Sequence, residues 1–331
     1  MDRFKVVLTD YEFEDFRFEE KVFKSSGLNI NFVKAQCKTE EEVIQIGKDA
    51  DALLNQYAPV GEKVINELEK CKVISRYGVG VNTIDVQAST NKGIFVSNVP
   101  DYGVEEVSNH ALALLLSSAR KITQLNAHIK SGQWDFKLAT PIYRFSKQTL
   151  GVLGFGRIPR VLVKKAQPLG FQILVHDPFV PEDDIRQMGA KPVPFEELLT
   201  ASDFISIHVP LVESTKHLIN KHTIRLMKKN AVIINTARGP IINENDLADA
   251  LKNRQIAGAA LDVAEEEPIP KDSPLLTMSN VILTPHSSWY SEEAMEELRT
   301  KTAQNVIEVL SGKKPTYFVN KELEKLSSVV K

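Results

Sequence analysis

The sequence has little of what marks several specialised classes of protein. Its 331 residues include only two cysteines, Cys37 and Cys71, whose spacing fits neither a metal site nor a redox motif. No apolar run approaches the roughly 18 residues that a membrane-spanning helix needs. The net charge of -2 leaves no basic footprint for nucleic acid or an anionic membrane. The sequence therefore predicts a metal-free protein that binds neither nucleic acid nor a membrane.

The N-terminal residues resemble no targeting segment. Residues 1–8 form a short strand-like run ending in Thr9-Asp10, which is unlike a secretory signal or a transit peptide. Together with the scarcity of cysteine, this predicts a cytoplasmic protein in a reducing compartment. A chain of this length can hold two domains, each with its own apolar core.

The centre of the chain carries the pattern of a strand, a glycine turn and a helix. The apolar run 149–153 ends in Gly154-Phe155-Gly156, and a helical pattern comes next. Gly154 permits a tight turn, and Gly156 permits a pyrophosphate to approach the free backbone N–H groups at the helix N-terminus. A third glycine is expected where Pro159 stands, but proline is tolerated in a first helical turn. The pattern predicts a dinucleotide site.

An acidic residue after the next strand indicates which dinucleotide binds. The apolar run 171–176 ends in Asp177, which lies 21 residues after Gly156. A carboxylate there accepts hydrogen bonds from the adenosine ribose and repels a 2′-phosphate. The sequence therefore predicts NAD rather than NADP as the cofactor.

Short apolar runs alternate with longer amphipathic segments in both halves of the chain. This alternation predicts βα units and mainly parallel sheets. A final amphipathic helix over 291–310 lies beyond the nucleotide domain, and we expect it to pack back on the first domain. The expected strands are 6–8, 30–33, 52–55, 73–75 and 95–97 in the first domain, and 150–153, 173–176, 204–208, 231–235, 256–261 and 281–284 in the second.

Two segments that precede the strand of the glycine turn predict a subunit contact. Residues 104–122 read as one long apolar helix, which must be covered by its own core and by a second subunit. Residues 130–147 lack a clear period and contain Trp134 and Tyr143 among polar residues. Irregular segments of this length commonly pack across a surface, often at a subunit interface, so the sequence predicts a contact with a second subunit.

Polar residues come directly after four of the predicted strands. Ligands in open α/β sheets bind beyond the carboxyl ends of the strands. In the first domain, the backbone N–H groups of the loop Gly78-Val79-Gly80 can hold a carboxylate. Three strand ends of the second domain present Arg238, Glu267 and His286.

These three residues form a coherent chemical set. Arg238 offers a fork of donors to a substrate carboxylate and carbonyl. His286 can exchange a proton with the reacting oxygen near neutral pH. Glu267 beside the imidazole favours its charged form, so that the ring remains a proton donor while a carbonyl is reduced.

The order of these motifs resembles the D-isomer-specific 2-hydroxyacid dehydrogenases across essentially the whole chain. The resemblance implies two doubly wound parallel-sheet domains, with a Rossmann nucleotide domain inserted in a flavodoxin-like substrate domain. Residues 101–286 would bind NAD, and residues 1–100 with 287–331 would form the discontinuous substrate (catalytic) domain. The motifs are Gly154-Phe155-Gly156, Asp177, His208-Val209-Pro210, Asn235-Thr236-Ala237-Arg238-Gly239, Asp262-Val263, Glu267-Pro268 and Thr284-Pro285-His286.

The resemblance implies a role for each matching residue. Arg238, Glu267 and His286 would be catalytic, and the family is generally dimeric through its nucleotide domains. The substrate would bind to Tyr77, Gly78, Val79, Gly80, Arg238 and Trp289. The cofactor would bind to Gly154, Phe155, Gly156, Arg157, Ile158, Asp177, His208, Val209, Pro210, Thr236, Ala237, Arg238, Asp262 and His286.

The expected function is the interconversion of a 2-oxo acid and a D-2-hydroxy acid by NAD-dependent hydride transfer. Residues 76–81 resemble phosphoglycerate dehydrogenases, but residues 55–59 lack the arginine that many of those enzymes use for the substrate phosphate. Phosphoglycerate is therefore possible and not favoured. Residues 286–291 and Pro159 instead resemble the C-terminal-binding proteins, in which the tryptophan reaches the substrate pocket. An NAD(H)-sensing corepressor-like protein is the alternative function.

Overall fold

The computed structural model describes residues 3–326 of the chain, which fold as two compact units. One unit consists of residues 1–103 with 291–331, and the other of residues 104–290. The ends of the expected first domain, residues 1, 2 and 327–331, lie outside the described residues. No helix of the described part is both long enough and apolar enough to cross a membrane.

The first unit is built on a five-stranded sheet in which all strands are parallel. The strand order is β2-β1-β3-β4-β5, which is the flavodoxin-like doubly wound order. Each strand lies within one residue of its predicted bounds, except that the first begins two residues earlier. The strands are β1 (Phe4–Leu8), β2 (Ile30–Lys34), β3 (Ala52–Asn55), β4 (Val73–Arg76) and β5 (Phe95–Ser97).

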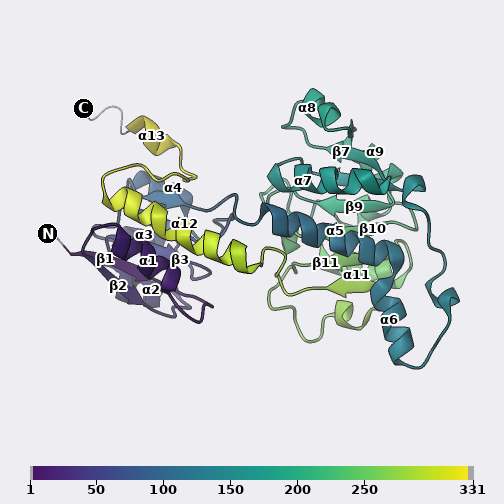
Figure 1. Ribbon diagram of the computed structural model, residues 1–331, viewed down its shortest axis with the longest axis horizontal. Helices are drawn as coiled ribbons and strands as arrows, with labels where there is room; N and C mark the ends of the chain where they lie inside the picture. Colours follow the sequence, from purple (N-terminus) through teal and green to yellow (C-terminus); the bar gives the residue numbers. More distant parts are fainter. Residues whose placement is uncertain (1–2, 327–331) are drawn as a thin grey trace. The chain divides into compact units, whose positions relative to one another are not determined.

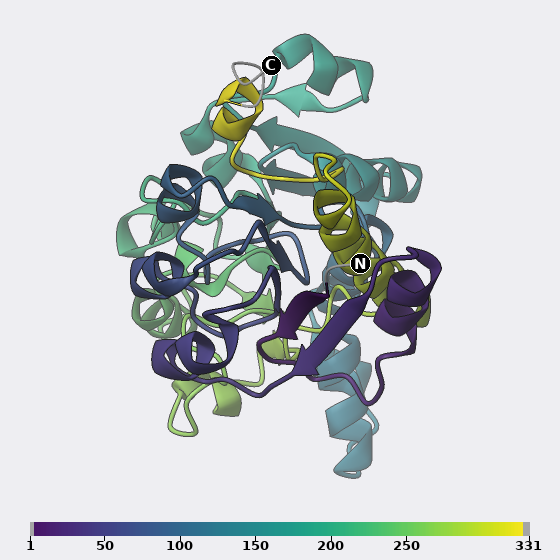
Figure 2. The ribbon, with the colours of Figure 1, turned by 90° about the vertical axis from the view of Figure 1, so that its left-hand side faces the viewer.

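Helices cover this sheet and complete its apolar core. Val7, Leu53, Ile74 and Val96 come from four neighbouring strands and are all 0% exposed. The late helix α12 (Glu292–Leu310) packs on α1, β3 and β4, and Figure 2 shows it in yellow beside the purple α1. The other helices are α1 (Arg17–Ser25), α2 (Glu40–Gly47), α3 (Glu62–Glu67), α4 (Val86–Asn91) and α13 (Glu322–Leu326).

The second unit contains a seven-stranded parallel sheet (Figure 1). Its strand order is β12-β11-β10-β9-β6-β7-β8, so the direction of winding reverses between β6 and β9, as in a Rossmann fold. The strands are β6 (Thr149–Leu153), β7 (Gln172–His176), β8 (Lys191–Pro192), β9 (Phe204–Ile207), β10 (Val232–Asn235), β11 (Gly258–Leu261) and β12 (Val281–Leu283).

Both faces of this sheet are buried, which explains its continuous apolar runs. Along β10, Ile233 contributes to one core cluster, whereas Val232 and Ile234 contribute to the cluster on the opposite face. Helices cover the two faces. The helices of this unit are α5 (Val104–Arg120), α6 (Ile122–Lys130), α7 (Arg157–Ala166), α8 (Glu182–Gln187), α9 (Phe195–Ala201), α10 (Lys221–Ile224) and α11 (Glu244–Lys252), of which α6 buries none of its residues.

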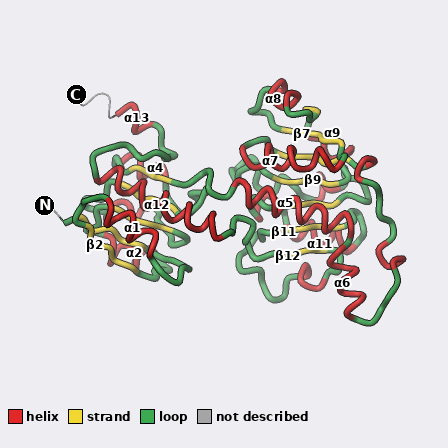
Figure 3. The backbone as a smooth tube through the Cα atoms, in the orientation of Figure 1, coloured by secondary structure: helices red, strands yellow, loops and turns green. Residues whose placement is uncertain are grey.

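The predicted single helix over 104–122 is wrong in one respect. The helix ends at Arg120 because Lys121 adopts a left-handed conformation with φ 53°, and α6 then begins at Ile122. The segment after α6 is mostly loop, as predicted, with two short 3₁₀ turns at Phe136–Ala139 and Phe145–Lys147 (Figure 3).

Candidate active site and nucleotide site

The glycine turn after β6 has the geometry that a tight approach requires. Gly154 has φ 91°, and a Cβ on it would lie 2.9 Å from the backbone carbon and oxygen of His208. Its N–H donates to the backbone oxygen of His176 at 2.9 Å. Only glycine fits this position without strain, because both the conformation and the space exclude a side chain.

The helix after this turn offers an open N-terminus. Gly156 is the N-cap of α7, and no side chain of the described residues caps the helix there. A Cβ added to Gly156 would meet nothing within 4 Å, so the first amides of α7 are open to a ligand. Pro159 is buried in the first turn, where a missing N–H removes no intrahelical bond. The turn fits a pyrophosphate.

Asp177 lies at the same turn and helps to shape it. One carboxylate oxygen accepts from the Phe155 N–H at 2.7 Å, and the other accepts from the Phe179 N–H at 2.9 Å. The predicted ribose acid is therefore also bonded to the loop that would hold the pyrophosphate. Each oxygen has a second lone pair for a further donor.

His208 supports the turn from the neighbouring strand end. Its Nε2 lies 2.8 Å from the Ser206 hydroxyl. Burial lowers the pKa of this imidazole to about 4, so the ring is neutral at neutral pH. Val209 packs against the core, and the backbone oxygen of Pro210 accepts from the Thr215 hydroxyl at 2.6 Å.

The turn after β10 is shaped by Asn235, for which the sequence predicts no individual role. Its side chain accepts from the Ala237 N–H at 3.0 Å and donates to the Arg238 backbone oxygen at 2.9 Å. Thr236 is 8% exposed, and its hydroxyl has no partner among the described residues. This hydroxyl is therefore available to a ligand group, which fits the cofactor contact that the resemblance implies.

The turn after β10 lies directly against the loop that carries Glu267. A Cβ on Gly239 would lie 1.7 Å from the backbone oxygen of Ala264, so the two segments approach as closely as only glycine allows. Arg238 donates to the Ala237 backbone oxygen at 2.6 Å. Its charge is near enough to act on the carboxyl of Glu267.

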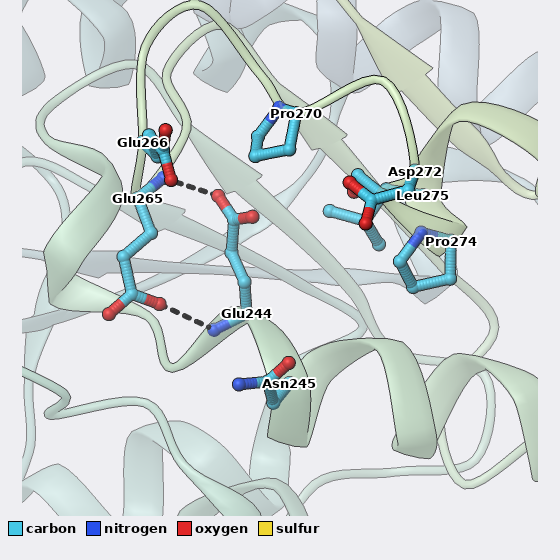
Figure 4. A pocket seen from close by; sticks show the side chains of 9 residues that line it. Glu244, Asn245, Glu265, Glu266, Pro270, Asp272, Pro274 and Leu275 are labelled. Atoms are coloured by element: carbon cyan, nitrogen blue, oxygen red, sulfur yellow. Dashed lines mark hydrogen bonds between the residues drawn. The ribbon is translucent and has the colours of Figure 1, made fainter.

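A second contact fixes the Glu267 loop from the side of α11. The N–H of Glu244 donates to Glu265 at 3.1 Å, and the N–H of Glu265 donates back to the Glu244 carboxylate (Figure 4). The pocket beside this pair has a volume of about 310 Å³. Its lining includes the carboxylates of Glu244, Glu265, Glu266 and Asp272 and no basic side chain, so it does not suit an acidic substrate.

Glu267 and His286 form the central pair of the candidate site. Nδ1 of His286 lies 2.7 Å from a carboxylate oxygen of Glu267, whose other oxygen accepts from the Ala264 N–H at 3.0 Å. Burial opposes ionisation of Glu267, but the bond to His286 and the charges of His286 and Arg238 lower the pKa of the carboxyl below its usual value. An ionised Glu267 can only accept in this contact, so Nδ1 of His286 is the donor.

Asp262 holds the backbone around His286. Its backbone oxygen accepts from the His286 N–H at 2.7 Å, and its carboxylate accepts from the Ser287 and Ser288 N–H groups at 3.0 and 2.9 Å. The Thr284 hydroxyl donates to the same carboxylate at 2.6 Å. The structure thus gives Asp262 a role in shaping the loop, in addition to the cofactor contact that the resemblance implies.

The predicted substrate loop belongs to the other unit. Tyr77 is 3% exposed, and its hydroxyl donates to Glu19 at 3.1 Å. The backbone oxygen of Gly78 accepts from Val99 at 2.9 Å, and that of Val79 accepts from the Asn98 side chain at 2.7 Å. Trp289, within the second unit, is half-buried and packs edge-on against Tyr290, with ring centroids 5.8 Å apart.

Comparison with known proteins places this site in a family. Residues 112–288 match the family model described as D-isomer specific 2-hydroxyacid dehydrogenase, NAD binding domain. The chain belongs to the D-isomer-specific 2-hydroxyacid dehydrogenases. Its nucleotide unit is the NAD-binding domain of that family, and the chain is an NAD-dependent oxidoreductase of 2-hydroxy acids.

The relatives of this dehydrogenase carry more than one substrate name. It is 46% identical to the D-3-phosphoglycerate dehydrogenase of Methanocaldococcus jannaschii over 284 residues, which cover 85% of this chain and 54% of that enzyme. The chain thus spans about half the length of that relative. It is 37% identical to the glyoxylate reductase of Korarchaeum cryptofilum over 292 residues, which cover 87% of this chain and 88% of that enzyme.

A solved structure of the family extends the likeness to both units. The D-lactate dehydrogenase of Aquifex aeolicus, complexed with NAD and lactic acid, superposes with a TM-score of 0.85 at 28% identity, covering 97% of each chain. These relatives are all named as dehydrogenases or reductases. They support an enzyme and give no support to the corepressor alternative.

Proposed function

We propose that this dehydrogenase reduces a small, non-phosphorylated 2-oxo acid to the D-2-hydroxy acid, and catalyses the reverse reaction, with His286 as proton donor and acceptor. The observation that carries the proposal is the 2.7 Å contact between Nδ1 of His286 and Glu267. An ionised carboxylate only accepts hydrogen bonds, so Nδ1 is the donor in this contact. Nε2 is then the atom that exchanges a proton with the substrate oxygen.

Arg238 would orient the substrate, and Glu267 would hold the imidazole of His286 in place through its Nδ1. The guanidinium matches a carboxylate in charge and in its planar fork of donors. The lowered pKa of Glu267 supports its role, because an ionised carboxylate accepts the hydrogen bond from Nδ1 of His286.

The nucleotide unit would hold NAD through the features that fit it. Bound NADH supplies the hydride. The amides of Gly156, Arg157 and Ile158 would bind the pyrophosphate beside Gly154 and Phe155, and Asp177 would accept from the ribose hydroxyls. The remaining cofactor contacts would come from His208, Val209, Pro210, Thr236, Ala237, Arg238, Asp262 and His286.

The loop at residues 77–80 would bind the substrate carboxylate through the N–H groups of Val79 and Gly80. The bonds of Asn98 and Val99 to the carbonyl oxygens of this loop support the proposal, because they fix the backbone that would present these amides. Trp289 would pack on an apolar substrate side chain. On this basis the first unit, residues 1–103 with 291–331, would be the substrate domain predicted at 1–100 with 287–331, and the second unit, residues 104–290, would be the NAD domain predicted at 101–286.

The stretch at residues 55–59 favours an uncharged substrate end. It contains no basic side chain, and Asn55 is bonded to Thr9, to the backbone of Ala58 and to Thr83. A substrate phosphate would therefore find no arginine in this stretch. We favour glyoxylate, hydroxypyruvate or a bulkier 2-oxo acid over phosphohydroxypyruvate.

The protein would act as a cytoplasmic homodimer that contacts its partner through the NAD domain. Several apolar side chains on α6 and the loop after it support this, because they are exposed in the single chain. They are Ile122, 55% exposed, Trp134, 89%, Phe136, 74%, and Tyr143, 49%.

The substrate and cofactor are tested together by following NADH and NADPH oxidation. The panel contains glyoxylate, pyruvate, hydroxypyruvate, phosphohydroxypyruvate and bulkier 2-oxo acids. We expect turnover with NADH and a non-phosphorylated acid. No turnover with any acid despite tight NADH binding would overturn the proposal, and faster turnover with NADPH would overturn the role of Asp177.

Replacing the proposed proton donor tests the mechanism. We expect His286→Ala to lower kcat by about 10²–10⁴-fold, which is the usual size of general acid–base catalysis. NADH affinity, measured by fluorescence titration, should stay within about twofold, since His286 is only one of many proposed cofactor contacts and its main role is to donate the proton. A parallel loss of NADH binding would show that His286 holds the cofactor rather than the proton.

A further inference from the structure

We propose that His110 is a positioning residue for His286 and acts through Thr284 and Asp262. The inference rests on the proposed function, because it assigns to His110 the placement of the proton donor. All four residues lie within the second unit, and His110 comes from α5, the helix that packs on β10 and β11.

The proton donor sits in a backbone conformation that needs support. His286 has φ 50°, which is the left-handed region that non-glycine residues seldom adopt. It persists because Asp262 accepts from three consecutive amides, those of residues 286, 287 and 288. The position of the imidazole therefore depends on the position and charge of the Asp262 carboxylate.

The Asp262 carboxylate needs partners because it is fully buried. Its side chain is 0% exposed, and a buried charge without hydrogen bonds is costly. Besides the two amides, the groups that face it are the Thr284 hydroxyl at 2.6 Å and Nε2 of His110 at 3.6 Å. Thr284 and His110 thus complete its surroundings.

The direction of the hydrogen bonds is set by chemistry. The Asp262 carboxylate can only accept hydrogen bonds, so the Thr284 hydroxyl must donate its single proton to Asp262. That hydroxyl can then only accept from His110, whose Nε2 lies 3.0 Å from it. Nε2 of His110 therefore carries a proton, and the chain runs from His110 through Thr284 to Asp262.

This chain connects α5 to the loop of the proton donor. If His110 is lost, the Thr284 hydroxyl is free to rotate away from Asp262, and the carboxylate can lose one of its three hydrogen-bond donors. The loop would then hold His286 less exactly, although no group that touches substrate or cofactor has changed. A displacement of a catalytic group by about 1 Å can cost up to 10²-fold in rate.

The test compares matched pairs of variants in the full-length protein. Thr284→Val removes the hydroxyl at constant volume, and Thr284→Ser keeps it. His110→Leu removes the donor, and His110→Gln places an amide N–H near the position of Nε2. His222→Leu, an exposed histidine on α10, is the control for losing a histidine. The measurements are kcat, KM for both substrates, NADH affinity and the thermal midpoint.

We expect His110→Leu and Thr284→Val each to lower kcat by about tenfold or more while NADH affinity stays within about twofold. His110→Gln and Thr284→Ser should stay within about threefold of wild type, as should His222→Leu. The double variant His110→Leu with Thr284→Val should be no slower than the slower single variant, because both break one chain.

Three outcomes would overturn the inference. These are an unchanged kcat in His110→Leu, a failure of His110→Gln to restore kcat, and multiplicative losses in the double variant. His286→Ala serves as the reference. If it retains turnover, the proposed function itself fails, whereas its loss alongside an active His110→Leu overturns only the role of His110.

Discussion

Both units contain a glycine-spaced loop directly after a parallel strand, yet the chain takes a different course after each loop. Gly154-Phe155-Gly156 leads at once into α7, whose N-terminus no described side chain caps. Gly78-Val79-Gly80 leads into a turn, and α4 begins only at Val86. There the Asp85 carboxylate already accepts from the Ala88 N–H at 2.9 Å.

The difference teaches what makes a glycine turn a phosphate site. A carboxylate at a helix N-terminus accepts a hydrogen bond from an unpaired amide and neutralises the positive end of the helix dipole. A second anion is therefore not attracted. The open amides of α7 keep that attraction. Glycine spacing alone is therefore not diagnostic, and the helix behind the turn decides which ligand it suits.

The largest expected effect is the loss of stability when alanine replaces a glycine in each of the two turns. Gly154→Ala should lower the free energy of unfolding by about 3 kcal/mol, because it combines a left-handed penalty with overpacking against immovable backbone. Gly78→Ala, with φ 134°, should cost only about 1–2 kcal/mol, since its Cβ would meet the movable end of the Arg76 side chain. Urea denaturation of both variants measures the difference, and equal losses would contradict the comparison.

A substitution at Gly156 should have a smaller effect, which falls on NADH binding and not on folding. A Cβ there meets nothing in the protein, so Gly156→Ala should leave the thermal midpoint within about 2 °C of wild type. The methyl group would occupy the space proposed for the pyrophosphate, and NADH affinity should fall about tenfold, or about 1.4 kcal/mol. Unchanged affinity would show that the pyrophosphate does not lie over Gly156.

Lowering the pH from 7 to 5 should destabilise the second unit more than the first. All seven histidines lie between residues 104 and 290, and none lies in the first unit. The folded pKa of His208 is about 4, below its usual 6.5. Between pH 6.5 and about 4, His208 binds a proton in the unfolded chain but not in the folded chain. The free energy of unfolding therefore falls as the pH decreases.

The free energy of unfolding should be about 1 kcal/mol lower at pH 5 than at pH 7. A fully buried ring would contribute about 1.4 kcal/mol for each unit of pKa shift, and the value for His208 is smaller because the ring keeps some exposure. His208→Gln lacks the titration and should lose correspondingly less stability between pH 7 and pH 5 than wild type. Denaturant titrations at the two pH values measure this. Identical losses would exclude His208 as the source.

The smallest effect concerns the capped helix of the first unit. Asp85→Ala removes the cap of α4 and should lower the free energy of unfolding by about 1 kcal/mol. NADH affinity should not change, because this helix lies outside the nucleotide unit. A change in NADH affinity would mean that the two glycine loops are not as independent as their local structures indicate.

Much of the fold was predictable because the periodicity of apolar residues and the capping and turn residues are local properties of the sequence. The apolar runs place every strand except β8 to within one or two residues, and Asn243 and Ser291 cap α11 and α12 where the sequence indicates helix starts. The break at Lys121 was not predictable, because lysine carries no signal for a left-handed conformation. Lys121 interrupts an otherwise continuous helical pattern.

The chemistry of the site was also visible in the sequence, because strand ends of a parallel sheet meet at one edge. That argument brings Glu267 and His286 together, and the structure shows them bonded. Their support was not visible. Asn235 and Asp262 read as motif residues, and His110 reads as part of an apolar helix.

The sequence by itself determined the family, the two parallel sheets and the residue types of the reaction, since each depends on short-range order along the chain. The tertiary structure alone decided which buried polar groups hold the site. Thr284 lies 22 residues from Asp262 and 174 from His110, and no local pattern encodes these contacts. They arise only when the sheet and α5 are packed, because buried polar groups bond to whatever neighbour the fold provides.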